Sequence, residues 1–125
     1  MQTKIDLANG LQISRVVTGL WQIADMERDG KTLDPIATSK FMAPYVEAGL
    51  TSFDMADHYG SSEIIAGTFK NSLADKNKVQ LFTKWVPKPG KITREDVREA
   101  IHTALDRMQQ PCIELLQFHA WYYPD

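Results

Sequence analysis

The sequence predicts an α/β fold in which parallel strands alternate with helices. Segments of strand character and segments of helical periodicity follow one another along the 125 residues, an order typical of right-handed crossovers between parallel strands. Four reactive side chains come at or soon after the ends of successive predicted strands: Asp54, Tyr59, Lys84 and His119. The gaps from Tyr59 to Lys84 and from Lys84 to His119 each have roughly the length of one strand, one helix and two loops. Reactive residues at the ends of successive strands are typical of α/β barrels, whose active sites lie where the strands end.

Length and charge limit the number of domains and the classes of partner. A chain of 125 residues with 43% apolar residues suits one domain with one hydrophobic core. The net charge of -2 provides no field that would attract nucleic acid or anionic lipid. The N-terminus is polar, and no stretch approaches the roughly 18 apolar residues of a membrane span. We therefore expect a cytoplasmic protein with neither a nucleic-acid nor a membrane partner.

The first elements are strands. Asn9-Gly10 lies between two alternating apolar pairs in residues 5–13, which predicts a small β-hairpin. The β-branched run from Val16 to Leu20 predicts a buried parallel strand. The polar segment that follows contains the turn signal Asp29-Gly30 and is interpreted as a loop.

The first helix has start, kink and stop signals. Asp34 followed by Pro35 provides an N-cap and a proline at the first helical position. Pro44 should kink this helix, and Gly49 is placed to end it. Its apolar face is predicted from two pairs of residues four apart, Phe41 with Tyr45 and Met42 with Val46.

The strand and helix pattern then repeats. Residues 50–54 and 79–83 are predicted strands on either side of a helix at residues 62–73, whose aligned apolar positions are Ile65, Phe69 and Leu73. Residues 93–96 resemble a capping box. The helix that follows carries an apolar stripe of Val97, Ile101, Leu105 and Met108. Residues 113–118 form the last predicted strand, and Cys112 before it is interpreted as a small buried residue rather than a catalytic thiol.

The four strand-end residues can protonate a reduced carbonyl group. A carbonyl attacked by hydride becomes an alkoxide, and Tyr59 could supply the proton. Lys84 could stabilise the resulting phenolate, and Asp54 could anchor that lysine. His119 could hydrogen-bond the carbonyl oxygen. Taken singly, each residue also has a structural interpretation, as a backbone cap, a loop aromatic, a solvated charge or a partly buried histidine.

Two further groups of residues have functional and structural interpretations. Trp21, Trp85 and Trp121 follow strand ends and could line an apolar carbonyl pocket, or could simply cover the rim of the sheet. Asp57 and His58 beside Asp54 suggest a divalent metal ion. No second histidine stands near them, so a metal hydrolase is the less favoured hypothesis and we expect no metal.

The motifs of the chain resemble one known family. Residues 53–60, FDMADHYG, precede Ser62-Glu63, and residues 82–84, FTK, and 115–119, LLQFH, follow in order. Gly19-Leu20-Trp21 and residues 47–50, EAGL, also match. The chain resembles the aldo-keto reductase family over essentially its whole length. Met55 departs from the threonine that is common in the family motif, at a position that does not donate the proton.

The resemblance implies a function and a site. It implies reduction of aldehydes or ketones by NADPH on a (β/α)8 TIM barrel that begins with a β-hairpin. Tyr59 corresponds to the family's proton donor, and Asp54, Lys84 and His119 correspond to its other catalytic residues. Gly19, Trp21 and Asp54 are the positions expected to contact the cofactor. The expected substrate is a small carbonyl compound.

The sequence accounts for only part of such a barrel. A full barrel needs more than about 200 residues and often binds phosphate in the loops after its last two strands. Only the first four barrel strands are predicted in this sequence. No glycine-rich phosphate-binding run compensates. We therefore expect residues 1–125 to form the N-terminal half of an aldo-keto reductase domain, a truncated one that lacks most of the cofactor-binding region. The alternative is a non-catalytic half-barrel module that pairs through its open outer strands, residues 16–20 and 113–118, with itself or another half-barrel.

Overall fold

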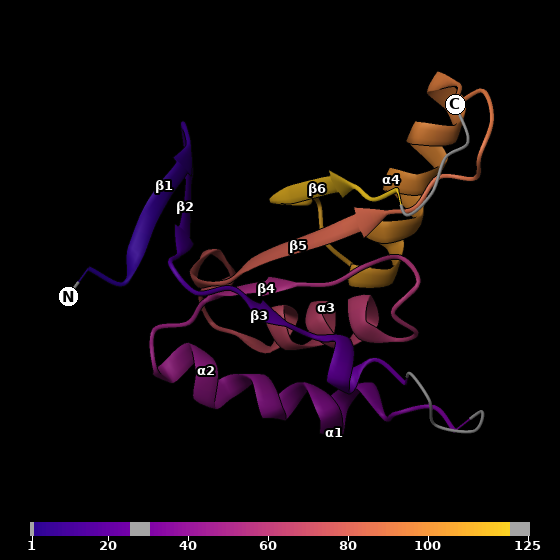
Figure 1. The fold of residues 1–125 in the computed structure, drawn as a ribbon. Helices are drawn as coiled ribbons and strands as arrows, with labels where there is room; N and C mark the ends of the chain where they lie inside the picture. Colours follow the sequence, from indigo (N-terminus) through magenta and orange to yellow (C-terminus); the bar gives the residue numbers. More distant parts are fainter. Residues whose placement is uncertain (1, 26–30, 121–125) are drawn as a thin grey trace.

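A four-stranded parallel sheet forms the centre of the molecule (Figure 1). The computed structural model describes residues 2–25 and 31–120. The strands lie side by side in chain order: β3 (Thr18–Gly19), β4 (Ser52–Asp54), β5 (Gln80–Trp85) and β6 (Leu115–Phe118). Each strand is parallel to the next, which confirms the α/β prediction. The predicted turn at Asp29-Gly30 and the tryptophan at position 121 lie outside the described residues.

The helices lie on one face of this sheet. They are α1 (Pro35–Ser39), η2 (Lys40–Met42), α2 (Ala43–Glu47), α3 (Ser62–Ser72) and α4 (Arg94–Met108), with short turns η1 (Trp21–Ile23) and η3 (Lys76–Lys78). Helix α1 packs on α3, and α3 packs on α4. Because spatial order follows chain order, right-handed crossovers place successive helices on the same face, as in a barrel. No helix in residues 2–25 and 31–120 is long and apolar enough to cross a membrane.

The first helical segment follows its sequence signals but exposes part of its predicted apolar face. The Asp34 side chain accepts a hydrogen bond from Ala37 N at 2.7 Å, with Pro35 at the first turn. Pro44 lies where the 3-10 turn η2 gives way to α2, because proline has no N–H and crowds the carbonyl four residues earlier. Met42 and Val46 are buried, but Phe41 and Tyr45 are 70% and 46% exposed. The prediction was wrong for that pair.

Two predictions near the outer strands need correction. The strand predicted from Val16 to Leu20 is limited to the two residues of β3, and Val16 is 60% exposed. Among the described residues β3 pairs only with β4, so no described strand covers its outer side and Val16 stays exposed. Cys112 is exposed, because it lies in the surface connection between α4 and β6. By contrast, β5 extends beyond its predicted end as far as Trp85.

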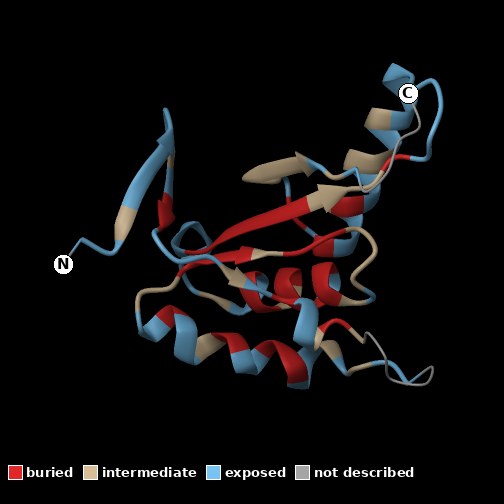
Figure 2. Ribbon diagram, in the orientation of Figure 1, coloured by how far each residue is buried: buried red, intermediate tan, exposed pale blue. Residues whose placement is uncertain are grey.

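The hydrophobic core lies between the sheet and the helices, and Figure 2 shows the buried residues concentrated in α3, β4 and β5. Phe53 on β4 and Leu81 on β5 are register partners that point into it. Helices α3 and α4 cross closely at Gly67, where an added Cβ would lie 2.0 Å from the carbonyl oxygen of Met108. The remaining members include Leu20, Met42, Val46, Met55, Ile65, Ala66, Phe69, Val79, Ala104 and Met108.

The N-terminal hairpin is present as predicted and lies at the end of the sheet where the strands begin (Figure 1). It consists of β1 (Lys4–Ala8) and β2 (Leu11–Ser14), joined at Gly10, whose φ is 79°. Ser14 and Ser52 exchange two hydrogen bonds of 2.9 and 3.0 Å between backbone N–H and hydroxyl oxygen. These bonds tie the hairpin to β4, and the opposite end of the sheet stays open for a site.

Candidate active site

Strand register places the expected site residues on one face of the sheet. Gly19 is the register partner of Asp54, and Lys84 is the partner of Gln117. Asp54 is also the partner of Phe82, two residues before Lys84, and side chains two residues apart on a strand share a face. This face is opposite to the one that carries Phe53 and the helices. The polar side chains therefore meet on the face opposite the helices, at the carboxyl ends of the strands.

Lys84 forms the centre of the site. Its ammonium group forms an ion pair with Asp54 and donates a hydrogen bond of 2.7 Å to the Met55 carbonyl oxygen. The Lys84 side chain is only 13% exposed and that of Asp54 is 26% exposed. Gln117 donates from Nε2 to the second carboxylate oxygen of Asp54 at 3.0 Å. Charge and hydrogen bonding thus hold three strands together at this point.

Tyr59 lies in the loop between β4 and α3 and reaches this pair. A tight turn positions it, because its N–H donates to Ala56 O at 3.0 Å and its carbonyl accepts from Ser62 N at 2.9 Å. The Lys84 Nζ atom is 5.0 Å from the centre of the Tyr59 ring. Trp21 packs edge-on against the same ring, with centroids 5.1 Å apart. The structure therefore brings Asp54, Tyr59 and Lys84 together, with Trp21 beside them.

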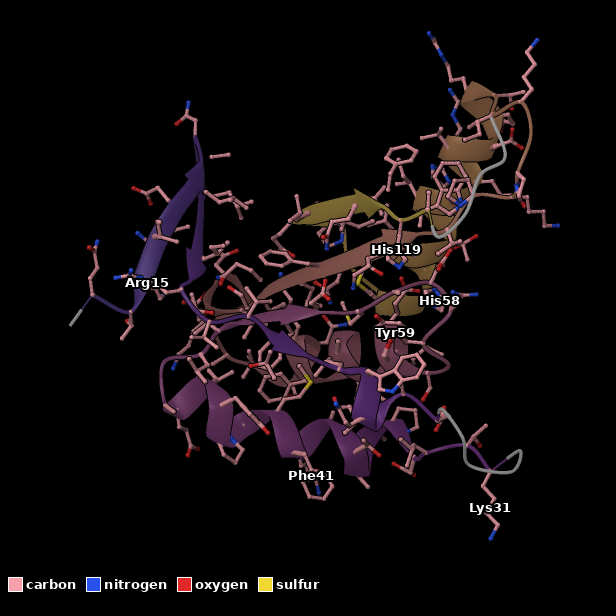
Figure 3. The ribbon with its side chains drawn as sticks, in the orientation of Figure 1. Arg15, Lys31, Phe41, His58, Tyr59 and His119 are labelled. Atoms are coloured by element: carbon pink, nitrogen blue, oxygen red, sulfur yellow. The ribbon has the colours of Figure 1, made fainter. Side chains whose placement is uncertain are left out.

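His119 completes the group from the end of β6, as Figure 3 shows for His58, Tyr59 and His119. Its N–H donates to Trp85 O at 2.9 Å, which continues the pairing of β5 with β6. Its ring is nearly parallel to that of His58, at an interplanar angle of 4° and a centroid distance of 6.2 Å. The His58 ring is in turn 4.9 Å from that of Tyr59. All four expected catalytic residues thus lie in one connected cluster.

Asp57 and His58, the residues considered for a metal site, contact each other. Asp57 Oδ1 is 2.9 Å from His58 Nδ1, and Asp57 Oδ2 accepts from Val86 N at 3.0 Å. Within the described ranges no group of three histidine, cysteine or acidic side chains could hold a metal ion. The two carboxylate oxygens of Asp57 are used to link the tyrosine loop to the end of β5.

The two described tryptophans of the site have different surroundings. Trp21 is 40% exposed and packs on Tyr59, so it can contribute an aromatic wall next to the proton donor. Trp85 packs instead on Phe118, with centroids 5.3 Å apart. Of these two, Trp21 fits the pocket interpretation better.

The structure adds contacts that the sequence did not indicate. Gln117 was predictable in principle, because it lies two residues before His119 on the same strand face. Glu63 is buried, accepts from the Thr83 hydroxyl at 2.5 Å and pairs with Arg107 at 3.2 Å. Arg107 also donates to the Asp57 carbonyl oxygen at 3.0 Å. This contact joins residues fifty positions apart, so no local pattern could reveal it.

A cavity of about 520 Å³ opens beside these residues, between the β5–α4 connection and helix α4. Lys84, Asp57, His58, Glu63 and Arg107 are among its lining residues. Acidic and basic side chains both line it, so it offers no single-sign field to a ligand. The cavity gives solvent and small molecules access to the side of the cluster.

Similar proteins identify the family. The sequence model of the aldo/keto reductase family matches residues 15–125. Aflatoxin B1 aldehyde reductase member 2 of Rattus norvegicus is 34% identical over 95 residues, which are 73% of this chain and 26% of that protein. The 6-dehydroglucose reductase of Agrobacterium fabrum is 32% identical over 84 residues, covering 65% of this chain and 27% of that protein. The matched region therefore spans about a quarter of these curated relatives.

Solved structures share the fold. An aldo-keto reductase from Klebsiella pneumoniae in complex with NADPH superposes with a TM-score of 0.75 at 16% identity, over 100% of this chain and 41% of that one. This likeness confirms that the sheet and helices form part of a TIM-barrel arrangement with a leading hairpin. Since the family pattern extends over residues 15–125, the chain belongs to the aldo/keto reductase family.

Proposed function

We propose that this protein reduces aldehydes or ketones to alcohols with a nicotinamide cofactor, which the resemblance to the family indicates is NADPH. Membership of the family supports an oxidoreductase activity, and the aldehyde reductase among the relatives points to carbonyl substrates. The observation that carries the proposal is the position of the Lys84 ammonium between the Asp54 carboxylate and the Tyr59 ring. We place the activity in the cytoplasm, with a small carbonyl compound as substrate.

The mechanism assigns the proton to Tyr59. Its hydroxyl donates to the oxygen that becomes an alkoxide when the carbonyl carbon is reduced. Lys84 stabilises the phenolate that remains, and its ion pair with Asp54 fixes the ammonium beside the ring. His119 donates a hydrogen bond to the same substrate oxygen and orients the carbonyl. Trp21 packs against the Tyr59 ring in a T-shaped arrangement and restricts its orientation.

The residues expected at the cofactor fit that role. When bound, a reduced nicotinamide would supply hydride to the carbonyl carbon. A Cβ added at Gly19 would meet nothing within 4 Å, so the end of β3 is open to a ligand next to Asp54. Asp54 accepts one hydrogen bond on each oxygen, and a carboxylate oxygen can accept two. Its carboxylate therefore has capacity for a ribose hydroxyl, and Trp21 offers a flat surface for a ring.

We further propose that residues 1–125 act as one half of a barrel, the half that supplies the proton-donating residues. Phosphate groups in such barrels are usually held after the last strands, and four barrel strands are described here. The second candidate is a non-catalytic half-barrel module that pairs with itself or with another half-barrel. It is supported by the outer strands β3 and β6, each of which has one neighbour among the described strands.

The reductase proposal is tested by restoring a complete barrel. Residues 1–125 are fused to the C-terminal part of the Agrobacterium fabrum relative, and NADPH and NADH oxidation are followed with a panel of aldehydes. We expect aldehyde-dependent NADPH oxidation that Lys84→Met lowers by at least about a hundredfold, because the ammonium partner of the phenolate is lost. Lys76→Met, at an exposed position in the turn η3 before β5, is the matched control and should retain activity. Equal rates in the Lys84→Met variant and the unsubstituted fusion would contradict the assignment.

A further inference from the structure

We propose that His58 is a positioning residue that holds the His119 imidazole in its working orientation. This inference rests on the reductase function proposed above and concerns a residue outside the four expected catalytic ones. His58 directly precedes Tyr59 in the chain, and its ring contacts both other rings of the cluster. The Tyr59 ring lies 4.9 Å away at 74°, and the His119 ring lies 6.2 Å away at 4°.

The His58 ring is itself anchored to the scaffold. Its Nδ1 atom is 2.9 Å from Asp57 Oδ1, and the other carboxylate oxygen accepts from Val86 N at 3.0 Å. The Asp57 carbonyl oxygen accepts from Arg107 of α4 at 3.0 Å. The end of β5 and helix α4 therefore both fix the residue that holds His58. A carboxylate at Nδ1 selects the neutral tautomer with its proton on Nδ1.

The backbone and the ring of His119 are fixed by different contacts. The hydrogen bond from its N–H to Trp85 O fixes the backbone, but it leaves rotation about χ1 and χ2. The His58 ring lies nearly parallel to the His119 ring and restricts these rotations. Asp57, His58 and His119 thus form a chain of contacts from the scaffold to the group that orients the carbonyl. A misplacement of about 1 Å in such a group can lower a rate about a hundredfold.

The first test uses the restored barrel and needs no activity. Long-range ¹H–¹⁵N correlation spectra of the imidazoles, recorded at about pH 8 where unperturbed histidine is neutral, report the tautomers of His58, His102 and His119. We expect the Nδ1–H tautomer for His58 in the wild type. His102, exposed on α4, is the internal reference. A His58 ring with its proton on Nε2 would overturn the anchoring by Asp57 and with it the proposal.

The second test compares two substitutions. His58→Ala removes both the ring and its anchor, and should shift and broaden the His119 ring signals while those of His102 stay in place. His58→Phe keeps a flat ring, so the His119 signals should change less than in His58→Ala. Unchanged His119 signals in His58→Ala would contradict the proposal. If His58→Ala fails to fold, His58→Phe and the wild-type tautomer decide the question.

A third test separates this inference from the reductase proposal. In the restored barrel, His58→Ala should lower kcat about tenfold to a hundredfold with a smaller change in KM, and His102→Ala should change neither. Tyr59→Phe is measured in parallel. If Tyr59→Phe keeps its activity, the reductase site itself is wrong. If Tyr59→Phe loses activity and His58→Ala keeps the kcat of the unsubstituted fusion, only the role of His58 is refuted.

Discussion

Lys84 connects three segments of the chain through one ammonium group. It comes from β5, and its partners are the Asp54 carboxylate, the Met55 carbonyl and the Tyr59 ring. An ammonium has three donor hydrogens, so it can satisfy several partners from one position. The opposite charges of Asp54 and Lys84 at the ends of two predicted strands, together with the family resemblance, predicted that these residues would meet. The Met55 carbonyl contact was not predictable, because it depends on how the backbone turns after β4.

Gly60 shapes the loop that carries Tyr59. Its φ is +50°, and an added Cβ would lie 2.0 Å from the Ala24 carbonyl oxygen. Gly60→Ala should therefore lower the free energy of unfolding by more than the about 1–2 kcal/mol typical of left-handed strain alone. It should also displace the segment that holds Trp21 against Tyr59. Urea unfolding measures the first effect, and near-ultraviolet circular dichroism of the aromatic residues measures the second.

Gly49→Ala is the matched control for Gly60→Ala. Its φ is +86°, but an added Cβ would meet nothing within 4 Å. This substitution introduces left-handed strain without a collision, and it lies at the end of α2, away from the site. Equal losses of stability in the two variants would show that the contact between Gly60 and Ala24 does not constrain the loop.

At the scale of elements, single residues predicted where helices begin and break, whereas the sequence pattern predicted less accurately which side chains are buried. The Asp34 cap, the break at Pro44 and the capping box at Thr93 all occur where expected, because each depends on local backbone chemistry. The exposure of Phe41 was not predictable, since the face that a helix buries depends on which elements pack against it. The same holds for the β-branched run at Val16, which has strand composition but no described neighbour on its outer side.

Gly67 tests the crossing of α3 and α4. Alanine favours a helix by about 1 kcal/mol over glycine, but a Cβ here would lie 2.0 Å from the Met108 carbonyl oxygen. Separating two packed backbones costs about 1–3 kcal/mol, so we expect Gly67→Ala to lower the free energy of unfolding in urea. Thr68→Ala, the next residue of α3, should stay within about 0.5 kcal/mol. A stabilised Gly67→Ala variant would contradict the close crossing.

The N-terminus of α4 provides a pH dependence. Hydrogen bonds from the Thr93 side chain, and then from its backbone N–H, lower the pKa of Asp96 below its ordinary value. A carboxylate with a lowered folded-state pKa stabilises the fold above its unfolded pKa of about 3.9, and this contribution is lost as the pH falls through the folded value. Asp96→Asn should therefore be less stable than the wild type at pH 7.

Urea unfolding of wild type and Asp96→Asn between pH 7 and pH 3 checks this dependence. The difference in stability should shrink below about pH 4. Glu95→Gln, an exposed neighbour in the same turn, should show a smaller effect because Glu95 takes part in an exposed ion pair with Arg98. A difference between wild type and Asp96→Asn that is independent of pH would exclude the ionised capping box as its source.

At the scale of the whole molecule, the described sheet has two outer strands with apolar side chains nearby. Phe118 on β6 is 62% exposed, and a second cavity of about 330 Å³ lies beside β3, lined in part by Phe41 and Tyr45. Unpaired strand edges with apolar surface promote association. The alternation of strands and helices predicted the α/β class, and the family resemblance implied the barrel, but the exposure of these edges depends on tertiary packing and could not be predicted from a local pattern.

We therefore expect the purified 125-residue chain to form a dimer or larger assembly, or to bind the dye ANS as a loosely packed state does. Light scattering with chromatography gives the mass, and a fluorescence titration gives the dye binding. Adding a charge at the edge, as in Phe118→Lys, should reduce both. A monodisperse monomer that binds no dye and melts cooperatively would show that the four strand and helix units close a core without further strands.

The central claim is that Tyr59, supported by Lys84, protonates the reduced carbonyl. Its most direct measurement is the single-turnover rate of aldehyde reduction at saturating NADPH, compared between the restored barrel and its Tyr59→Phe variant. Phenylalanine keeps the ring that packs on Trp21 and removes only the donor. We predict a rate at least about a hundredfold lower in the variant, with NADPH affinity unchanged. A rate within about twofold of the unsubstituted fusion would contradict the claim, because loss of a general acid should cost far more.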